Sequence, residues 1–273
     1  MVATSVETAF RTLDGLELRG TIVTPAVTVR HAVVLVHGGG VTREEGGFFE
    51  RLADGLADVA VASLRFDLRG HGQSEGRQED VTLSAILNDI RVALAHLREA
   101  SGVGTASLLG ASFGGGLCAY YAAKRPDEVQ RLVLLNPQLD YKKRTIDSRD
   151  YWSGDYLDDE TSRRLAGQGY IDFTPTFRHG RALLNEVFWL SPHLSLGEIA
   201  APTLIVHGTR DTFVPVESSR WAVSQLEAEH RLVEIDGSQH GFAVHDDPGY
   251  LDPQSREWQA LVIRTVAEWI TAA

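Results

Sequence analysis

The chain has 273 residues, of which 43% are hydrophobic and 23% are charged, and this composition is typical of one large globular domain with a full core. Its formal net charge of −11 argues against a partner that is nucleic acid or an anionic membrane surface, and no run of about 18 apolar residues is present to span a bilayer. Residues 1–10 lack the basic and apolar stretches of a secretory signal, and the single cysteine, Cys118, excludes an internal disulfide, so we expect a cytoplasmic protein.

The first part of the chain predicts a sheet that changes from antiparallel to parallel. Strands predicted at 7–12 and 17–23 flank Asp14-Gly15, a pair that is typical of a hairpin turn. The next strand, at 32–36, is apolar at every position, as is usual for a strand buried on both faces of a parallel sheet. A helix at 44–56, a strand at 59–66 and a helix at 83–100 follow. This alternation predicts an α/β fold with helices on both faces of the sheet.

A pentapeptide of the pattern G-x-S-x-G, with Ser112 at its centre, follows the strand predicted at 106–109 and precedes a helix predicted at 113–124. A sharp turn from strand to helix exposes the serine side chain in a cleft, and the glycines let neighbouring backbone approach closely. A serine hydroxyl becomes a good nucleophile when a base lies beside it. We therefore predict that Ser112 is a catalytic nucleophile.

The regular alternation stops after a strand predicted at 131–135. Residues 138–195 contain no clear buried strand but hold nine aromatic residues. We interpret this segment as a lid inserted between the first part of the core, residues 1–137, and the second part, residues 196–273. Most of its aromatic rings are expected to form the segment's own small core. The rings predicted to contact substrate are Trp152, Phe188 and Trp189.

The same segment carries six arginines. We interpret them as a solvated basic face that balances nearby acidic residues, and a contact with a substrate carboxylate is the alternative. They are Arg144, Arg149, Arg163, Arg164, Arg178 and Arg181.

The last part of the chain supplies a candidate acid and a candidate base. Asp211 follows a strand predicted at 202–206, and His240 follows a strand predicted at 231–235 on a loop bracketed by glycines. Ligands of open α/β sheets bind at the carboxyl ends of the strands. A carboxylate there can orient an imidazole and stabilise its charged form. Helices are predicted at 216–226 and 253–271.

Each of these two assignments has a rival. Asp140 is the alternative acid, because it lies just beyond the strand at 131–135. His245 is the alternative base, with Asp246 and Asp247 beside it. We favour Asp211 and His240 because each lies directly after a strand, which gives the chain order nucleophile, acid, base.

An oxyanion hole needs two backbone N–H groups that point at the developing negative charge. One is expected from Phe113, in the first turn of the helix that follows Ser112. The other is expected from Gly39 in the run His37-Gly38-Gly39-Gly40, with Gly40 as the alternative. The ring of Phe113 is also predicted to line the acyl pocket.

Four motifs in this order resemble the α/β-hydrolase superfamily, and the resemblance extends over essentially the whole chain. They are residues 37–40, residues 65–74 with the sequence RFDLRGHGQS, residues 110–115, and residues 207–211 together with His240. The resemblance implies a mostly parallel, eight-stranded sheet with helices on both faces and a lid insertion. It also implies that residues 65–74 brace the structure and take no part in the chemistry.

Within that superfamily, residues 62–67 and the length of the mid-chain segment are similar to the cinnamoyl/feruloyl-esterase-like group. In that group the insertion covers the aromatic acyl part of an ester. Two positions depart from the usual pattern. Gly39 stands where that group carries a bulky residue, and Ala111 precedes the nucleophile where esterases commonly have histidine.

The combined features predict a serine hydrolase that cleaves a carboxylic ester through an acyl-enzyme, and an aromatic acyl ester is one candidate substrate. A thioesterase, amide hydrolase or acyltransferase would use the same three side chains. A ligand-binding protein that keeps the fold without hydrolysis is the alternative from another class. We expect no metal, no cofactor and no nucleic-acid partner, a small-molecule ester or thioester as substrate, and we leave a homodimer open.

Overall fold

The computed structural model describes residues 2–245, 247 and 249–272. Within this part of the chain the main sheet has eight strands in the order β1-β2-β4-β3-β5-β6-β11-β12. They are β1 (Thr4–Arg11), β2 (Glu17–Thr24), β3 (His31–Val36), β4 (Val61–Phe66), β5 (Ala106–Ala111), β6 (Val129–Leu135), β11 (Thr203–Gly208) and β12 (His230–Ile235). β2 pairs antiparallel with β1 and with β4, and the other neighbours in the sheet are parallel. The predicted entry hairpin and parallel sheet are therefore confirmed.

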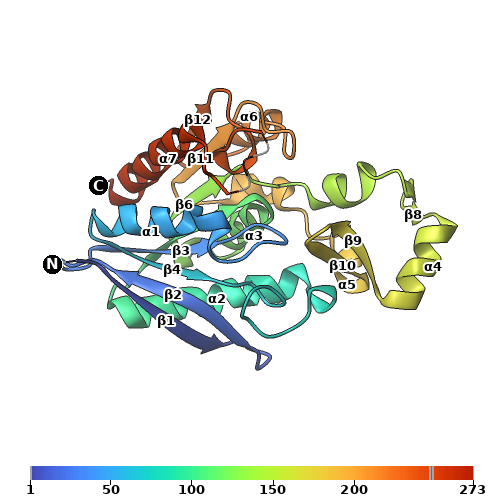
Figure 1. The fold of residues 1–273 in the computed structure, drawn as a ribbon, viewed down its shortest axis with the longest axis horizontal. Helices are drawn as coiled ribbons and strands as arrows, with labels where there is room; N and C mark the ends of the chain where they lie inside the picture. The colour runs from blue at the N-terminus through green and yellow to red at the C-terminus, as the bar shows by residue number, and fades with distance from the viewer. Residues whose placement is uncertain (1, 246, 248, 273) are drawn as a thin grey trace.

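Helices cover both faces of this sheet (Figure 1). The helices of the described residues are α1 (Phe48–Ala57), α2 (Leu83–Ser101), α3 (Ser112–Lys124), α4 (Asp159–Gln168), α5 (Arg181–Glu186), α6 (Glu217–Val223) and α7 (Pro253–Thr271). Of these, α4 and α5 belong to the segment between β6 and β11 and do not cover the main sheet. Short helical turns are η1 (Glu45–Gly47), η2 (Gln78–Asp80), η3 (Pro126–Glu128), η4 (Lys143–Asp147), η5 (Pro192–Glu198) and η6 (His240–Phe242). Among the described residues, no helix is both long enough and apolar enough to cross a bilayer.

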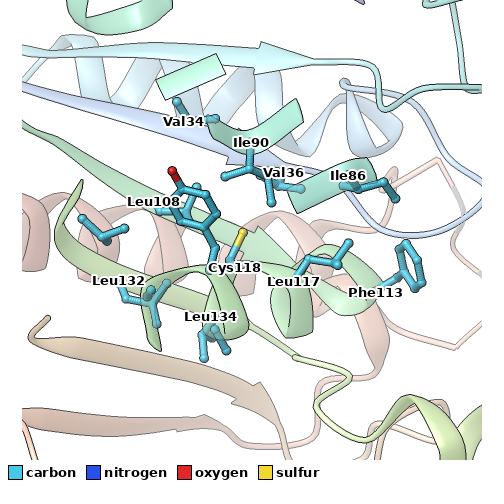
Figure 2. Close-up of a cluster of buried hydrophobic side chains, with 14 of the residues drawn as sticks. Val34, Val36, Ile86, Ile90, Leu108, Phe113, Leu117, Cys118, Leu132 and Leu134 are labelled. Atoms are coloured by element: carbon cyan, nitrogen blue, oxygen red, sulfur yellow. The ribbon is translucent and has the colours of Figure 1, made fainter. Parts of the chain in front are cut away.

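Strand β3 shows why its sequence is apolar throughout. Val33 and Leu35 pack into the cluster formed with α1 and α7. Val34 and Val36 point to the opposite face and pack into the cluster formed with α2 and α3. Figure 2 shows side chains of α2 and α3 meeting those of the strands in this second cluster. Successive side chains of a strand face opposite sides, so a strand between two helical layers must be apolar at every position.

Helix α1 begins later than the sequence predicts. Glu45, Gly46 and Gly47 have φ values of 46°, 62° and 87°, and a right-handed helix cannot pass through this left-handed turn. Phe48 is therefore the first residue of the helix. The turn directs the Glu45 side chain toward the end of the sheet where the candidate catalytic residues lie.

Residues 65–74 hold a loop at the same end of the sheet. Asp67 is buried and accepts hydrogen bonds from the Arg43 backbone N–H at 2.8 Å, from Arg43 Nη1 at 2.6 Å and from the Gln73 N–H at 3.0 Å. A Cβ atom at Gly72 would lie 2.3 Å from the Asp67 carboxyl carbon, so glycine is required there. His71, in the same turn, accepts a hydrogen bond from the Gly40 N–H. This agrees with the bracing role that the resemblance implies.

The segment between β6 and β11 lies at one end of the molecule, on the right of Figure 1. It contains the short strands β7 (Trp152–Ser153), β8 (Tyr156–Leu157), β9 (Tyr170–Thr174) and β10 (Phe177–Gly180). The expectation that residues 138–195 hold no buried strand is wrong for β10, because its residues Phe177 and His179 are buried. The strand has four residues, FRHG, with one large apolar side chain, and Phe177 is buried by contact with the core, which no local apolar run reveals.

Candidate active site

Ser112 lies at the junction of β5 and α3 in a strained backbone conformation, with a φ of 49°. The turn is tight enough to require glycine on both sides. A Cβ atom at Gly110 would lie 2.6 Å from the Gly114 carbonyl oxygen, and one at Gly114 would lie 2.5 Å from the His37 carbonyl oxygen. The turn therefore holds the Ser112 side chain at the carboxyl end of the sheet, on the wall of a cavity.

His240 and Asp211 lie in line with this serine. His240 Nε2 is 3.0 Å from Ser112 Oγ, and His240 Nδ1 is 2.6 Å from Asp211 Oδ2. A carboxylate can only accept, so Nδ1 donates to Asp211, and Nε2 is left to accept the serine hydroxyl proton. The structure thus brings together three residues that are far apart in the sequence, in the arrangement used by serine hydrolases.

Asp211 is buried and fully engaged. Its Oδ1 accepts hydrogen bonds from the N–H groups of Phe213 at 2.8 Å and Val214 at 2.9 Å. His207 Nε2 lies 3.4 Å from Oδ2. Burial by itself would raise the pKa of Asp211, but the contacts with His207 and His240 outweigh burial and hold the pKa well below its ordinary value. The carboxylate therefore stays charged beside His240 at neutral pH.

The two rival residues are not in contact with Ser112. Asp140 accepts a hydrogen bond from the Lys143 N–H at 3.0 Å and lies 3.8 Å from His193, along a different cavity. Among the described residues, His240 is the histidine within hydrogen-bond distance of Ser112 Oγ, and His245 is not. Asp246, which the sequence associates with His245, lies outside the described residues.

The loop at 37–40 leaves one of its N–H groups unused. The Gly38 N–H donates to the Glu45 carboxylate, and the Gly40 N–H donates to His71 Nε2 at 3.2 Å. Within the described part of the chain, no acceptor is recorded for the Gly39 N–H. His37 stiffens the loop, since its Nδ1 donates to the Gly38 carbonyl oxygen at 2.7 Å. Gly39 thus has a free donor next to Ser112.

The Phe113 N–H has a matching position on the other side of the serine. As the second residue of α3, it lies in the first helical turn, where N–H groups lack an intrahelical acceptor. The positive end of the helix dipole adds to its attraction for negative charge. Its ring, in contrast, is 4% exposed and packs against Tyr141 and Phe177 with centroids 5.3 Å and 5.2 Å away. Figure 2 shows this ring at one end of the buried cluster.

Sequence reasoning missed Glu45, a partly buried acid on the wall of the cavity. Burial raises its pKa, although the hydrogen bond from Gly38 and the nearby His240 act in the opposite direction. A Cβ atom at Gly38 would lie 3.2 Å from Glu45 Oε1 and 3.3 Å from Ser112 Cβ, which shows how near the carboxyl group is to the serine. The signal for it in the sequence was the pair Gly46-Gly47, which marks an unusual turn.

Sequence reasoning also missed Phe177 of β10. A Cβ atom at Gly39 would lie 2.4 Å from the Phe177 ring, so the ring occupies the space of any side chain at position 39. The same ring lies 5.4 Å from the His71 ring. The Phe177 ring therefore contacts Gly39 and Phe113, which are the two candidate oxyanion donors. It also contacts His71, which accepts the Gly40 N–H. Its only signal in the sequence was indirect, namely the missing bulky residue at position 39.

The cavity beside Ser112 has a volume of about 400 Å³. Aromatic side chains on its wall are Phe48, Phe213, Phe242 and Tyr250, and the turn between β9 and β10 contributes Thr174, Pro175 and Thr176. Phe213 is 49% exposed, and its ring stacks on the His240 ring with centroids 5.3 Å apart. The cavity is thus largely apolar, with its polar groups gathered around the serine.

Three of the predicted substrate contacts lie elsewhere. Trp152 and Phe188 pack edge to face, 6.3 Å apart, within the 138–195 segment. Trp189 is 88% exposed. Among the described residues that line the cavity beside Ser112, none of these three is present, and the buried ring of Phe113, the fourth predicted contact, is also absent. Their predicted role in substrate binding gains no support from these positions.

Comparisons with known proteins agree with this fold. Residues 31–169 match the family described as the alpha/beta hydrolase fold. A monoacylglycerol lipase from Mycolicibacterium smegmatis is 25% identical over 99% of this chain and 98% of that protein. Lipase LipV from Mycobacterium tuberculosis is 37% identical over 67% of this chain and 69% of that protein.

A similar fold is found in Est1E from Butyrivibrio proteoclasticus, solved with bound ferulic acid, with a TM-score of 0.75 and 22% identity over 95% of this chain and 99% of that chain. An identity this low supports the fold and not the substrate. The family match over half of the chain, together with LipV, supports more than the fold. The chain belongs to the α/β-hydrolase fold family.

Proposed function

We propose that this protein hydrolyses carboxylic esters through an acyl-enzyme intermediate on Ser112. The observation that carries the proposal is the pair of contacts around His240, 3.0 Å to Ser112 Oγ and 2.6 Å to Asp211 Oδ2. Relatives named as lipases support the same reaction class. Est1E, whose structure holds ferulic acid, shares the fold.

In the first half of the reaction, Ser112 Oγ attacks the acyl carbon of the ester while His240 Nε2 takes the hydroxyl proton. Asp211 stabilises the imidazolium that forms. The N–H groups of Gly39 and Phe113 hold the oxyanion, and one such donor typically contributes about 2.7–4 kcal/mol to the stability of the transition state. His240 then gives its proton to the leaving alcohol oxygen.

In the second half, water attacks the acyl-enzyme with His240 as the base, which releases the carboxylic acid and restores Ser112. An aromatic acyl group is the proposed substrate feature, because the cavity wall carries the rings of Phe48, Phe213 and Tyr250. The 138–195 segment acts as the lid in this proposal. Its β9–β10 turn lines the cavity, and Phe177 packs on Gly39.

The test is covalent labelling with a fluorophosphonate probe, read by intact mass, on wild type, Ser112→Ala and Ser162→Ala. Ser162 is an exposed serine of α4 and serves as the matched control. We expect one adduct on wild type and on Ser162→Ala, and none on Ser112→Ala. A folded wild-type protein that takes up no label would contradict the proposal and favour the ligand-binding alternative. A panel of esters, thioesters and amides then separates the reaction types that share the three side chains.

A further inference from the structure

A second cavity of about 560 Å³ lies next to the one that holds Ser112. It lies between the start of the 138–195 segment and the loop that carries Asp211. Its apolar wall is formed by Leu139, Phe213, Val214, Pro215 and Trp221. Phe213 lines both cavities. The ring that stacks on His240 is therefore part of the wall of both cavities.

Arg144 lies at this junction. Its guanidinium carbon is 5.0 Å from the centroid of the Phe213 ring and 5.9 Å from that of the Phe173 ring, and the residue lines the second cavity. It belongs to η4, a single turn of π-helix, which is a rare conformation found frequently at functional sites. Arg144 thus lies between the loop that carries Asp211 and strand β9. It contacts the same Phe213 ring that stacks on His240.

The structure separates the six arginines of the segment into two groups. Arg163, Arg164 and Arg181 are exposed, and Arg178 lies 3.6 Å from Asp172. The preferred interpretation as a solvated basic face holds for these four. Arg144 and Arg149 are partly buried, and among the described residues no carboxylate lies within ion-pair distance of either guanidinium.

The environment of these two arginines is cationic. Arg149 lies 4.1 Å above the Phe173 ring, and its Nη2 donates to the Phe173 carbonyl oxygen at 3.5 Å. Its buried Nε has no hydrogen-bond partner among the described residues. Burial, followed by the charge of Arg149, lowers the pKa of Arg144, although Asp211 acts in the opposite direction. Arginine nevertheless stays charged at any physiological pH. Among the described residues, neither guanidinium therefore has a carboxylate in direct contact, and Arg144 faces the cavity with only the more distant charge of Asp211 opposing its own.

The acidic residues of the second cavity are engaged elsewhere. Asp140 accepts from the Lys143 N–H and lies 3.8 Å from His193. Glu217 is exposed and lies 3.4 Å from Arg220. A partly buried guanidinium without a counter-charge is costly to maintain, and this is notable in a chain with 37 acidic and 26 basic residues. An anionic ligand group would supply the missing partner.

We propose that the second cavity is a substrate subsite in which Arg144 binds a carboxylate at the far end of the acyl chain. The chain of the substrate would lie along Phe213, with its ester carbonyl at Ser112 and its carboxylate at the guanidinium. The substrate class is then the monoester of a dicarboxylic acid. This inference rests on the proposed ester hydrolysis. It replaces the aromatic acyl group with a chain that ends in a carboxylate, and so specifies the charge and the length of the acyl group.

The experiment compares monomethyl esters of linear dicarboxylic acids with methyl esters of monocarboxylic acids of equal chain length, and methanol release is measured. The proteins are wild type, Arg144→Gln and Arg163→Gln. Arg163 is an exposed arginine of α4, and its variant serves as the matched control. We expect wild type and Arg163→Gln to prefer the charged ester. Arg144→Gln should lose about tenfold more kcat/KM on the charged than on the uncharged ester. Added salt should weaken the wild-type preference.

Several outcomes would overturn the inference. Equal or lower kcat/KM of wild type on the charged esters contradicts it, even when the uncharged esters are hydrolysed well. A preference confined to esters whose alcohol carries the carboxylate contradicts the assignment to the acyl side. Failure to hydrolyse any ester instead contradicts the proposed function. If Arg144→Gln does not fold, the wild-type preference and its salt dependence still decide the question.

Discussion

At the scale of single residues, the Asp211 carboxylate is held by contacts on both of its oxygens. The Phe213 and Val214 N–H groups hold one oxygen, while His240 and His207 approach the other. These contacts hold its pKa well below the ordinary value even though burial opposes them. A carboxylate held in this way can fix the tautomer of His240 without being protonated itself.

Asp211→Asn tests this role. The asparagine can keep the two backbone contacts through its carbonyl oxygen, so we expect the fold to be retained. It cannot stabilise the imidazolium, and kcat on an ester substrate should fall by a factor on the order of 10³–10⁴ with little change in KM. Asp127→Asn is the control, because Asp127 is an exposed residue of η3 that lines neither cavity, and its replacement should leave kcat nearly unchanged. An active Asp211→Asn variant would disprove the assignment.

At the scale of elements, β10 and the loop at 37–40 depend on each other. The backbone of Gly39 does not have a positive φ, whereas that of Gly40 has a φ of 77°. Gly40 therefore needs glycine for its conformation. Gly39 needs it for space, because the Phe177 ring would lie 2.4 Å from a Cβ atom. The 138–195 segment thus contacts the candidate oxyanion loop directly.

Because Gly39 is needed for space and not for its backbone conformation, a second substitution at Phe177 should suppress the effect of a substitution at Gly39. Gly39→Ala should force the loop away from Phe177 and lower kcat at least about tenfold, since a displaced oxyanion donor loses its contribution to the transition state. Phe177→Ala in the same chain should restore much of that loss by opening the space. Steady-state kinetics on a short-chain ester measure both effects.

The control for this pair is Phe173→Ala combined with Gly39→Ala. Phe173 packs on Phe177 with centroids 6.3 Å apart but is not among the atoms nearest to Gly39. It should therefore give no rescue. A Gly39→Ala variant with full activity would show that the loop and β10 are not in close contact.

At the scale of the whole molecule, stability should fall in mild acid. His179 is 2% exposed, and within the part of the chain that the structure describes neither of its ring nitrogens has a hydrogen-bond partner. Burial and the charge of Arg149 lower its pKa to about 3. Between that value and its ordinary pKa near 6.5, the unfolded chain binds a proton that the folded chain does not. The free energy of unfolding therefore decreases as the pH falls through this range, by up to about 1.4 kcal/mol per pH unit for one such histidine.

His179→Phe tests this source of acid sensitivity. Phenylalanine keeps the stacking on Phe173 and removes two unpaired polar atoms, so the variant should be more stable than wild type. The difference should be up to about 2 kcal/mol larger at pH 5 than at pH 7. Urea unfolding at both pH values measures it. A pH dependence in His179→Phe that is identical to that of wild type would refute the argument.

The sequence by itself determined the features that depend on neighbouring residues. The apolar run of β3, the hairpin signal at Asp14-Gly15 and the glycines around Ser112 each specify a local conformation, and from them follow the order of strands and helices along the chain. Ser112, Asp211 and His240 could be selected as candidates for the same reason. Each follows a strand, and the carboxyl ends of parallel strands meet at one edge of the sheet.

Only the tertiary structure decided the contacts between segments that are far apart in the chain. Phe177 lies on Gly39, Glu45 turns toward Ser112, and Arg144 lies over Phe213. It also showed that Trp189 is exposed and that β10 is buried. These outcomes depend on which surfaces are left for the 138–195 segment to pack against. Burial of that kind comes from long-range packing, which no local periodicity encodes.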